Sequence, residues 1–314
     1  MILDTATINQ LKENKSLITF ELLEALRAKG NEGKQICLDI LDTKKDEEDY
    51  YLDAFGGRIT YKSERDLKKA FTRMNLDQIH IDEIKRCASD FNYFRSNYLK
   101  IKTPTSGISF PDFRPYQNEF IEHILNPYEK LISLQPRQAG KSVTIGSWLS
   151  WEYTFDHDKD IGICGNDSKC ACEVLDKVKN MLNLLPMWMK VGTTIWNLKT
   201  IANENKMRIM TSASTSKNPF RGFTCSIIIV DECAFYEPQA WKTFKDAVFP
   251  SQSGLPWKKN IIISTANGIN HFSEIWNNSE KRKLIKNVKP TETVQLNNGK
   301  IITIEEYYKN KCQV

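Results

Sequence analysis

The sequence contains no run of about 18 consecutive apolar residues, and it therefore predicts no membrane-spanning helix. Its N-terminus lacks a basic patch followed by an apolar stretch, so we expect no secretory signal. Internal repeats and low-complexity tracts are also absent. Hydrophobic residues make up 40% and charged residues 26% of the 314 residues, which excludes disordered, collagen-like and disulfide-dense chains. The length favours more than one domain.

None of the eight cysteines forms a Cys-x-x-Cys pair. Without a secretory signal, we expect them to be reduced thiols. Cys170 and Cys172 stand close together, but no second pair and no nearby histidine completes four zinc ligands. We interpret these two cysteines as ordinary packing residues.

The net charge of +5 is modest and unevenly distributed. Residues 251–314 hold ten Lys and Arg against five Glu, so the first 250 residues are neutral. A basic C-terminal segment can contact nucleic acid, although a solvated surface is its commoner role.

Residues 1–107 are expected to form a mostly helical N-terminal region. Apolar residues recur at three- and four-residue spacing, the period of an amphipathic helix, in residues 11–29, 63–74 and 81–98. Ser63 and Asp66 have the spacing of a helix-capping signal. The Thr-Pro-Thr-Ser-Gly segment at 103–107 interrupts the pattern and marks the predicted domain boundary.

From residue 108 to 290, short apolar runs alternate with amphipathic stretches. The runs of strand length, rich in Ile and Val, are residues 131–135, 160–164, 226–230 and 260–264. The helical stretches that follow them are residues 141–155, 168–184, 238–248 and 272–286. Near-continuous apolar strands between helices indicate a parallel sheet covered on both faces, the core of an α/β domain.

Two hairpins are predicted in addition. Residues 193–201 and 207–212, joined by Asn-Glu-Asn, should pair as one hairpin, and residues 293–303 should turn at an Asn-Asn-Gly sequence. Residues 291–314 are expected to be a basic C-terminal segment or the start of a linker.

A phosphate-loop motif lies between the first apolar run and its helix. It consists of Gln135, Pro136, Arg137, Gln138, Ala139, Gly140, Lys141 and Ser142. This matches GxxxxGK[ST], except that Gln replaces the first Gly. At Gly140 the backbone can approach the phosphates closely, and the start of the following helix offers free N–H groups to them. Lys141 can neutralise the β- and γ-phosphates, and the Ser142 hydroxyl can bind Mg²⁺.

Two carboxylates end the third apolar run. Asp231 can hold the water shell of Mg²⁺, and Glu232 can polarise the water that attacks the γ-phosphate. Both motifs in this order predict an ATPase with a catalytic glutamate. GTPases instead position water with a Gln and carry a base-reading motif that this sequence lacks, so ATP and Mg²⁺ are the expected cofactors.

Two flanking segments could also contact the nucleotide. The Tyr116 ring could stack on adenine, and the amide of Gln117 could bond both a donor and an acceptor on the edge of adenine. Alternatively, Tyr116 and Gln117 merely begin a surface helix. After the fourth run, small and polar residues could sense the γ-phosphate and relay its loss, unless they form an ordinary turn. These are Ser264, Thr265, Ala266 and Asn267.

Two arginines are candidates for the extra positive charge that a phosphoryl-transfer transition state needs. Arg137 lies inside the phosphate loop, and Arg221 precedes the strand that ends in Asp231. The charge can come in cis or from a neighbouring subunit, and the sequence does not choose between the two residues. Arg221 could equally be a salt-bridge residue.

Together these motifs resemble the N-terminal ATPase domain of large terminases, the motors that package DNA in tailed bacteriophages. The resemblance covers residues 108–290 and rests on residues 113–117, 135–142, 228–235 and 264–267. The missing first Gly and the Arg inside the loop are features of that family. The resemblance implies a P-loop NTPase fold of the RecA-like (ASCE) type. It also implies Mg²⁺-dependent ATP hydrolysis that drives double-stranded DNA into a procapsid.

The same resemblance implies the partners and setting of the chain. They are double-stranded DNA, the portal protein, the small terminase subunit and a homo-oligomeric ring on the portal, the isolated chain being a monomer. No membrane is involved. The expected location is the host cell cytoplasm, with transient attachment to the viral procapsid. The resemblance carries nothing over to residues 1–100.

One departure concerns the nuclease domain that follows the ATPase domain in this family. Only 25 residues follow Lys289, with Glu292, Glu305 and Glu306 as their acids. We therefore expect no nuclease activity from this chain.

Two other functions compete with this interpretation. A two-domain helicase shares the motifs but needs a second RecA-like domain, and 47 residues follow Asn267. A nucleotide-gated module that binds DNA or portal would need no water-activating carboxylate, so Glu232 argues against it.

Overall fold

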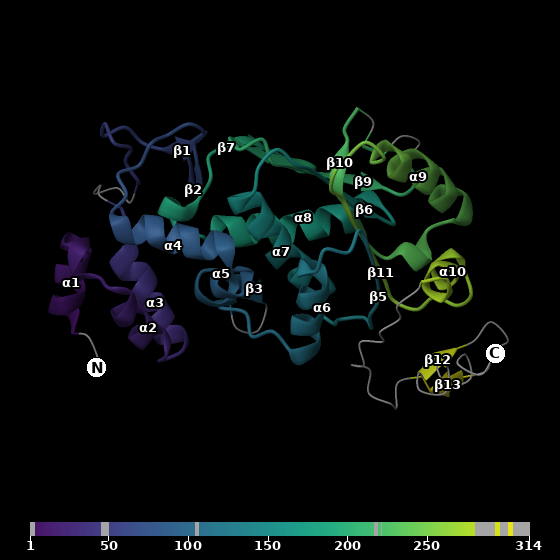
Figure 1. Cartoon of the computed structure of the whole chain (residues 1–314), viewed down its shortest axis with the longest axis horizontal. Coiled ribbons are helices and arrows are strands. Elements are labelled where there is room, and N and C mark those ends of the chain that lie inside the picture. Colours follow the sequence, from purple (N-terminus) through teal and green to yellow (C-terminus); the bar gives the residue numbers. More distant parts are fainter. Residues whose placement is uncertain are drawn as a thin grey trace. The chain divides into compact units, whose positions relative to one another are not determined.

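The computed structural model describes residues 4–44, 50–103, 107–216, 219–220, 222–279, 293–295 and 301–303 (Figure 1). The chain forms two compact units. Unit 1 comprises Met1–Asp112, Ile145–Lys159 and Glu173–Ile209, and unit 2 comprises Phe113–Thr144, Asp160–Cys172 and Met210–Val314. The chain passes between the units after Asp112 and after Lys159. It also does so inside helices α7 (Lys141–Phe155) and α8 (Ser168–Asn183) and inside strand β9 (Arg208–Ala213).

A seven-stranded sheet has the order β5-β11-β10-β6-β9-β8-β7. Its other strands are β5 (Lys130–Leu134), β6 (Asp160–Gly165), β7 (Thr193–Trp196), β8 (Thr200–Asn203), β10 (Cys225–Val230) and β11 (Lys259–Ser264). In unit 2, β5, β11, β10 and β6 pair in parallel, with Ile229 opposite both Ile261 and Ile163. Every residue of β10 and β11 is buried, as expected for strands covered on both faces. The predicted parallel sheet flanked by helices is confirmed.

The helices of unit 2 are α6 (Pro115–Leu125), α9 (Pro238–Ser251) and α10 (His271–Asn277), together with the short helix η3 (Cys233–Phe235). Proline at the first position of α6 and α9 suits a helix start, where its missing N–H costs no bond. Trp241 and Phe244 of α9 belong to one buried cluster with Ile228 and Val230 of β10. The predicted helix at 272–286 is seen as α10 up to Asn277, and residues 280–292 lie outside the described part.

The predicted hairpin at 193–212 is partly wrong. The first predicted strand, residues 193–201, is split between two antiparallel strands, β7 and β8, which together span residues 193–203. The Asn197 side chain accepts hydrogen bonds from the N–H groups of Lys199 and Thr200, and this Asx turn reverses the chain. The second hairpin is confirmed, because β12 (Thr293–Gln295) and β13 (Ile301–Thr303) pair antiparallel. Its turn lies outside the described residues.

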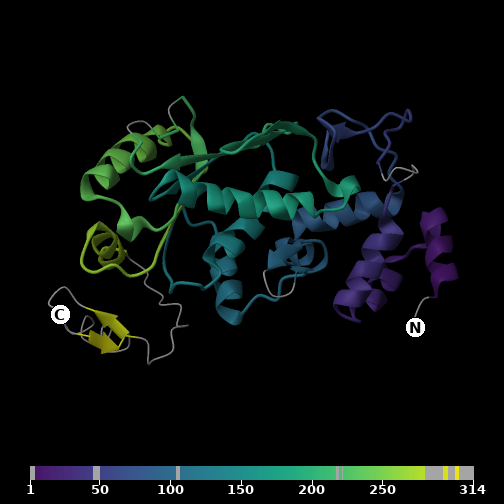
Figure 2. The same cartoon turned by 180° about the vertical axis from the view of Figure 1, so that it is seen from behind.

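Unit 1 contains the predicted helical region 1–107, and helices make up about half of the residues described there. Its helices are α1 (Thr5–Glu13), η1 (Lys15–Leu17), α2 (Phe20–Arg27), α3 (Asn31–Leu41), α4 (Gln78–Ser89), α5 (Phe91–Asn97) and η2 (Met187–Met189). Figure 2 shows α1, α2 and α3 side by side. The caps Asn14 and Asp90 divide the two longer predicted helices, since each accepts backbone N–H groups of the helix that follows. Among the described residues, none of the helices has the length and apolarity to cross a membrane.

The helix predicted at 63–74 is wrong. Strands β1 (Thr60–Tyr61) and β2 (Glu64–Lys68) pair antiparallel there, with Tyr61 opposite Glu64. Lys62 and Ser63 have φ angles of 50° and 65°, so they form a two-residue hairpin turn and Ser63 caps no helix. A further pair, β3 (Ile101–Thr103) and β4 (Gly107–Ser109), flanks the predicted domain boundary, which stays a prediction.

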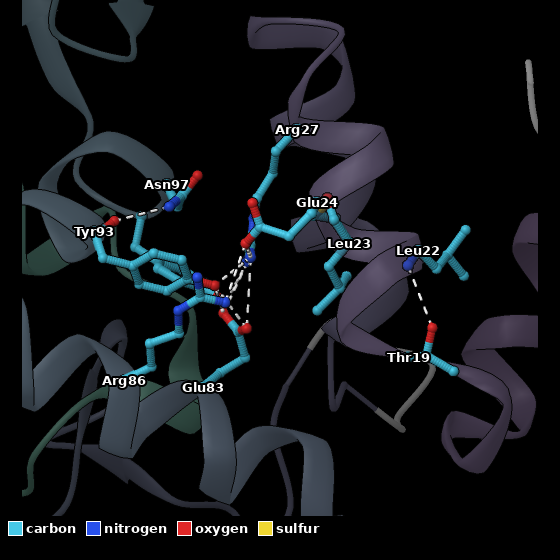
Figure 3. Close-up of polar contacts among 11 residues, drawn as sticks. Thr19, Leu22, Leu23, Glu24, Arg27, Glu83, Arg86, Tyr93 and Asn97 are labelled. Carbon is cyan, nitrogen blue, oxygen red and sulfur yellow. Dashed lines mark hydrogen bonds and ion pairs between the residues drawn. The ribbon is translucent and has the colours of Figure 1, made fainter.

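A buried ion pair joins two helices of unit 1 (Figure 3). Arg27 of α2 donates to Glu83 of α4, with Nη2 2.8 Å from Oε2, and both side chains are almost fully buried. The hydroxyls of Tyr93 and Tyr98 also donate to Glu83. Burial alone would lower the pKa of Arg27, but the charges and hydrogen bonds of these partners raise it, so the guanidinium stays charged.

Candidate nucleotide-binding site

The phosphate loop joins β5 to α7 within unit 2. Gln135, which stands where the motif usually has glycine, is buried and directly follows the strand. Its N–H donates to the Ser264 carbonyl of β11 at 3.0 Å, and its side-chain amide donates to the Ser133 hydroxyl at 2.9 Å. The buried side-chain amide thus has a partner in the preceding strand β5, and the backbone N–H continues the pairing with β11.

The second half of the loop turns the chain into α7. Gln138 and Gly140 have φ angles of 59° and 75°, a left-handed conformation that glycine adopts without strain. Helix α7 begins at Lys141, and Thr144 N–H bonds the Gly140 carbonyl at 2.9 Å. Because a helix N-terminus attracts anions, this geometry suits a phosphate.

Lys141 and Glu232 form an ion pair at the centre of the site. Lys141 Nζ lies 2.7 Å from Glu232 Oε1, and the lysine is only 8% exposed. The other carboxylate oxygen, Oε2, accepts the Thr265 N–H at 3.2 Å and the Thr265 hydroxyl at 3.1 Å. Three predicted residues, far apart in the sequence, thus meet at one carboxylate.

These contacts set the charge of Glu232. Burial would raise the pKa of its carboxyl group, but the hydrogen bond and charge of Lys141, with the two donors of Thr265, outweigh burial and hold the pKa below its usual value. Glu232 is therefore ionised near neutral pH and can only accept hydrogen bonds. Its backbone is left-handed, with φ 52° and ψ 41°, where the chain leaves β10.

Asp231 and Ser142 provide oxygen atoms at the same edge of the sheet, because β5 and β10 run in parallel and their carboxyl ends share that edge. Asp231 is 9% exposed, donates its N–H to the Cys164 carbonyl at 2.8 Å and accepts Glu232 N–H at 3.0 Å. Ser142 is half-buried in the first turn of α7. A hydroxyl and a carboxylate are ligands that Mg²⁺ prefers, so these residues fit that ion.

The segment after β11 contacts the segment after β10. The buried Ser264 hydroxyl accepts the Ala234 N–H at 3.0 Å, and the Asn267 side chain donates to the Ala234 carbonyl at 3.0 Å. Thr265 bonds Glu232, so three of the four predicted coupling residues bond to the segment after β10. Ala266 is exposed.

Two further residues that the sequence did not indicate also bond to the segment after β10. The Asn270 side chain donates to the Ala234 carbonyl at 3.0 Å, and His271 Nε2 lies 2.6 Å from the Cys233 carbonyl. Asn270 also caps α10, a signal that was available in the sequence as an Asn just before an amphipathic run.

Tyr116 and Gln117 make contacts within the protein. The Tyr116 hydroxyl accepts from the Arg114 guanidinium at 3.3 Å. The buried Gln117 amide accepts the Arg114 N–H at 3.0 Å and donates to the Thr144 hydroxyl at 3.0 Å. The predicted adenine contact of these two residues stays a prediction.

Of the two candidate arginines, the structure describes one. Arg137 is exposed, and its guanidinium carbon lies 5.9 Å from the centre of the Phe235 ring, within cation–π range. Arg221 lies outside the described residues.

Residues 132–314 match the family model for the terminase large subunit, T4-like-virus type, N-terminal part. The match spans more than half of the chain. This chain belongs to that family. The Lys141–Glu232 site and the coupling residues all fall within the matched region.

Several solved structures are similar to this terminase chain at low identity. The ATPase domain of the Thermus phage P74-26 large terminase is 16% identical over 52% of this chain and 68% of that chain, with a TM-score of 0.42. The bacteriophage HK97 large terminase is 18% identical over 56% and 37%, with a TM-score of 0.48. The large terminase of another thermophilic bacteriophage, in complex with ADP, is 15% identical over 49% and 39%, with a TM-score of 0.38. The chain thus spans little more than a third of the last two proteins.

Proposed function

We propose that this chain hydrolyses ATP with Mg²⁺ and that, as the ATPase part of a large terminase, it drives double-stranded DNA into a procapsid. The supporting observation is the carboxylate of Glu232, held by Lys141 at 2.7 Å on one oxygen and by Thr265 on the other. A water-activating base beside a phosphate-loop lysine favours hydrolysis over binding alone.

In the proposed mechanism, Lys141 exchanges partners. Its ammonium group neutralises Glu232 in the structure, and the γ-phosphate of ATP would compete for the same donor. Once Lys141 turns to the phosphate, Glu232 keeps the two donors of Thr265, which orient it. The ionised carboxylate then accepts a proton from the attacking water. Bound at Ser142 and Asp231, Mg²⁺ would supply positive charge to the phosphate oxygens.

Loss of the γ-phosphate would be relayed through the segment after β11. Thr265 bonds Glu232 directly, and Ser264 and Asn267 bond Ala234 two residues further on. A shift of Glu232 would therefore change bonds that hold the start of the segment leading to α10.

The remaining groups of the proposed motor would be brought together when subunits assemble into a ring. We assign Arg137 to the nucleotide of its own subunit and Arg221 to that of a neighbour in a ring on the portal. The isolated chain should be a slow monomer, since a trans arginine is worth about 10³–10⁵ in rate. The small terminase subunit and DNA complete the assembly, which works in the host cytoplasm while attached to the procapsid.

Steady-state phosphate release and nucleotide binding test the proposed ATPase. Glu232→Gln should still bind ATP but lose turnover by about 10² or more, and Lys141→Ala should lose binding as well. Glu274→Gln, which changes an exposed glutamate of α10, is the matched control and should hydrolyse ATP like the wild type. Unchanged turnover in Glu232→Gln would contradict the proposal, and ATP binding without any turnover in the wild type would favour the nucleotide-gated module.

A further inference from the structure

The amide of Gln117 is part of a buried chain of hydrogen bonds that ends on the phosphate loop. Arg114 N–H donates to Gln117 Oε1, and Gln117 Nε2 donates to Thr144 Oγ1, each at 3.0 Å. The Thr144 hydroxyl then donates to the Gly140 carbonyl at 3.1 Å. Gln117 is 8% exposed and Thr144 is 1% exposed, so little water competes for these bonds.

The same amide lies against the glycine of the loop. A Cβ atom on Gly140 would lie 2.6 Å from Gln117 Nε2, closer than any real Cβ contact. Because Gly140 has no side chain, the amide can approach the loop this closely, and its φ of 75° is a second reason for glycine there. Gln117 therefore contacts the loop at the residue that precedes Lys141.

We propose that Gln117 is a positioning residue for the phosphate loop, which acts through Thr144 and Gly140 on phosphate binding and does so independently of the base. This inference rests on the nucleotide site proposed above. A primary amide has two N–H groups and two lone pairs, and the hydrogen bonds to Arg114 and Thr144 use one of each. Both bonds are made within the protein, so the effect of Gln117 on the loop needs no base.

Inorganic tripolyphosphate separates the two roles, because it has the phosphates of ATP but no base. We expect Gln117→Ala to weaken ATP, GTP and tripolyphosphate binding by the same factor, about five- to tenfold for one buried hydrogen-bond link. The ratio of ATP to GTP affinity should not change. Calorimetric titration of the whole chain measures all three ligands.

Thr144 gives an independent arm of the same test. Thr144→Val keeps the shape of the side chain but removes the hydroxyl, so it should weaken tripolyphosphate binding as much as Gln117→Ala does. The double variant should be no weaker than either single variant, because both break one chain of bonds. Thr144→Ser restores a hydroxyl and should recover binding relative to Thr144→Val. Glu122→Gln, at an exposed position of α6, is the control and should bind all three ligands like the wild type.

Each other outcome has a distinct meaning. A loss confined to ATP, with GTP and tripolyphosphate unchanged in Gln117→Ala, would overturn the inference and make Gln117 a base reader. Additive effects of Gln117→Ala and Thr144→Val would also overturn it. A folded wild-type chain that binds neither ATP nor tripolyphosphate would instead contradict the proposed function itself.

Discussion

Glu232 is the residue at which three distant segments of the chain meet, because its carboxylate accepts Lys141 on one oxygen and Thr265 on the other. Its position beside Asp231 after an apolar run predicts a water-activating carboxylate, and Lys141 and Thr265 were predicted near the same nucleotide. The contact of Gln117 with Thr144 was not predictable, because Thr144 lies inside a helix whose pattern gives no sign of a polar partner. Bonds between side chains of different elements depend on packing that periodicity does not describe.

Thr265 should matter for turnover more than for binding. Thr265→Val removes the hydroxyl donor to Glu232 but keeps the backbone N–H, so the carboxylate loses one of two orienting bonds. We expect kcat to fall about tenfold, the scale of one hydrogen bond to a charged group, with little change in KM. Thr265→Ser keeps a donor and should retain most activity. Steady-state kinetics measure both parameters, and a wild-type kcat for Thr265→Val would show that the hydroxyl orients nothing.

The depressed pKa of Glu232 predicts how stability depends on pH without nucleotide. The ion pair stabilises the folded chain above the unfolded-state pKa of Glu232, near 4.5, and this contribution is lost as the pH falls through the lower folded-state pKa. The free energy of unfolding of the wild type should exceed that of Glu232→Gln at neutral pH. The difference should shrink below about pH 4.5. Denaturant unfolding of both chains across this range is the measurement, and a constant difference would contradict the ion pair.

Among elements, those of the parallel sheet were predictable and the hairpins less so. Apolar runs such as β10 and β11 are buried on both faces, so their composition alone identifies them. The segment 63–74 has helical spacing, yet Lys62 and Ser63 turn the chain into β2 without the Asn-Gly that usually marks such a turn. Pairing with β1 decides its structure, since tertiary contacts override local propensity.

The Arg27–Glu83 pair should be essential to the helices of unit 1 (Figure 3). Arg27→Met leaves a buried carboxylate without its cation, and we expect a loss of about 3–5 kcal/mol in the free energy of unfolding. Lys85→Met is the matched control, because Lys85 of α4 pairs at 3.9 Å with Asp82 and its own side chain is 71% exposed. That variant should lose about 1 kcal/mol or less. Chemical denaturation compares them, and equal losses would show that burial does not govern the pair.

For the molecule as a whole, sequence reasoning looked for domain boundaries at linkers. The two compact units meet in the chain at residues 112/113, close to the predicted limit at 107, and at 159/160, but the chain also crosses between them inside α7, α8 and β9. No change in composition marks such crossings, because the helix or strand continues through them. The predicted limits at 107 and 290 stay predictions, whereas family and fold follow from local motifs within unit 2.

A mixing experiment on the whole assembly tests the proposed trans role of Arg221. An Arg221→Ala chain keeps its own Lys141 and Glu232 but has no arginine for its neighbour. A Glu232→Gln chain has a dead site but supplies Arg221. When both are assembled on procapsids, an Arg221→Ala site beside a Glu232→Gln subunit is complete, so phosphate release should rise above that of either chain alone. A mixture of Glu232→Gln and Lys141→Ala is the control, since each site lacks a group of its own that no neighbour can supply. Recovery in the first mixture and none in the control supports Arg221 in trans, and no recovery in either mixture would contradict the trans role.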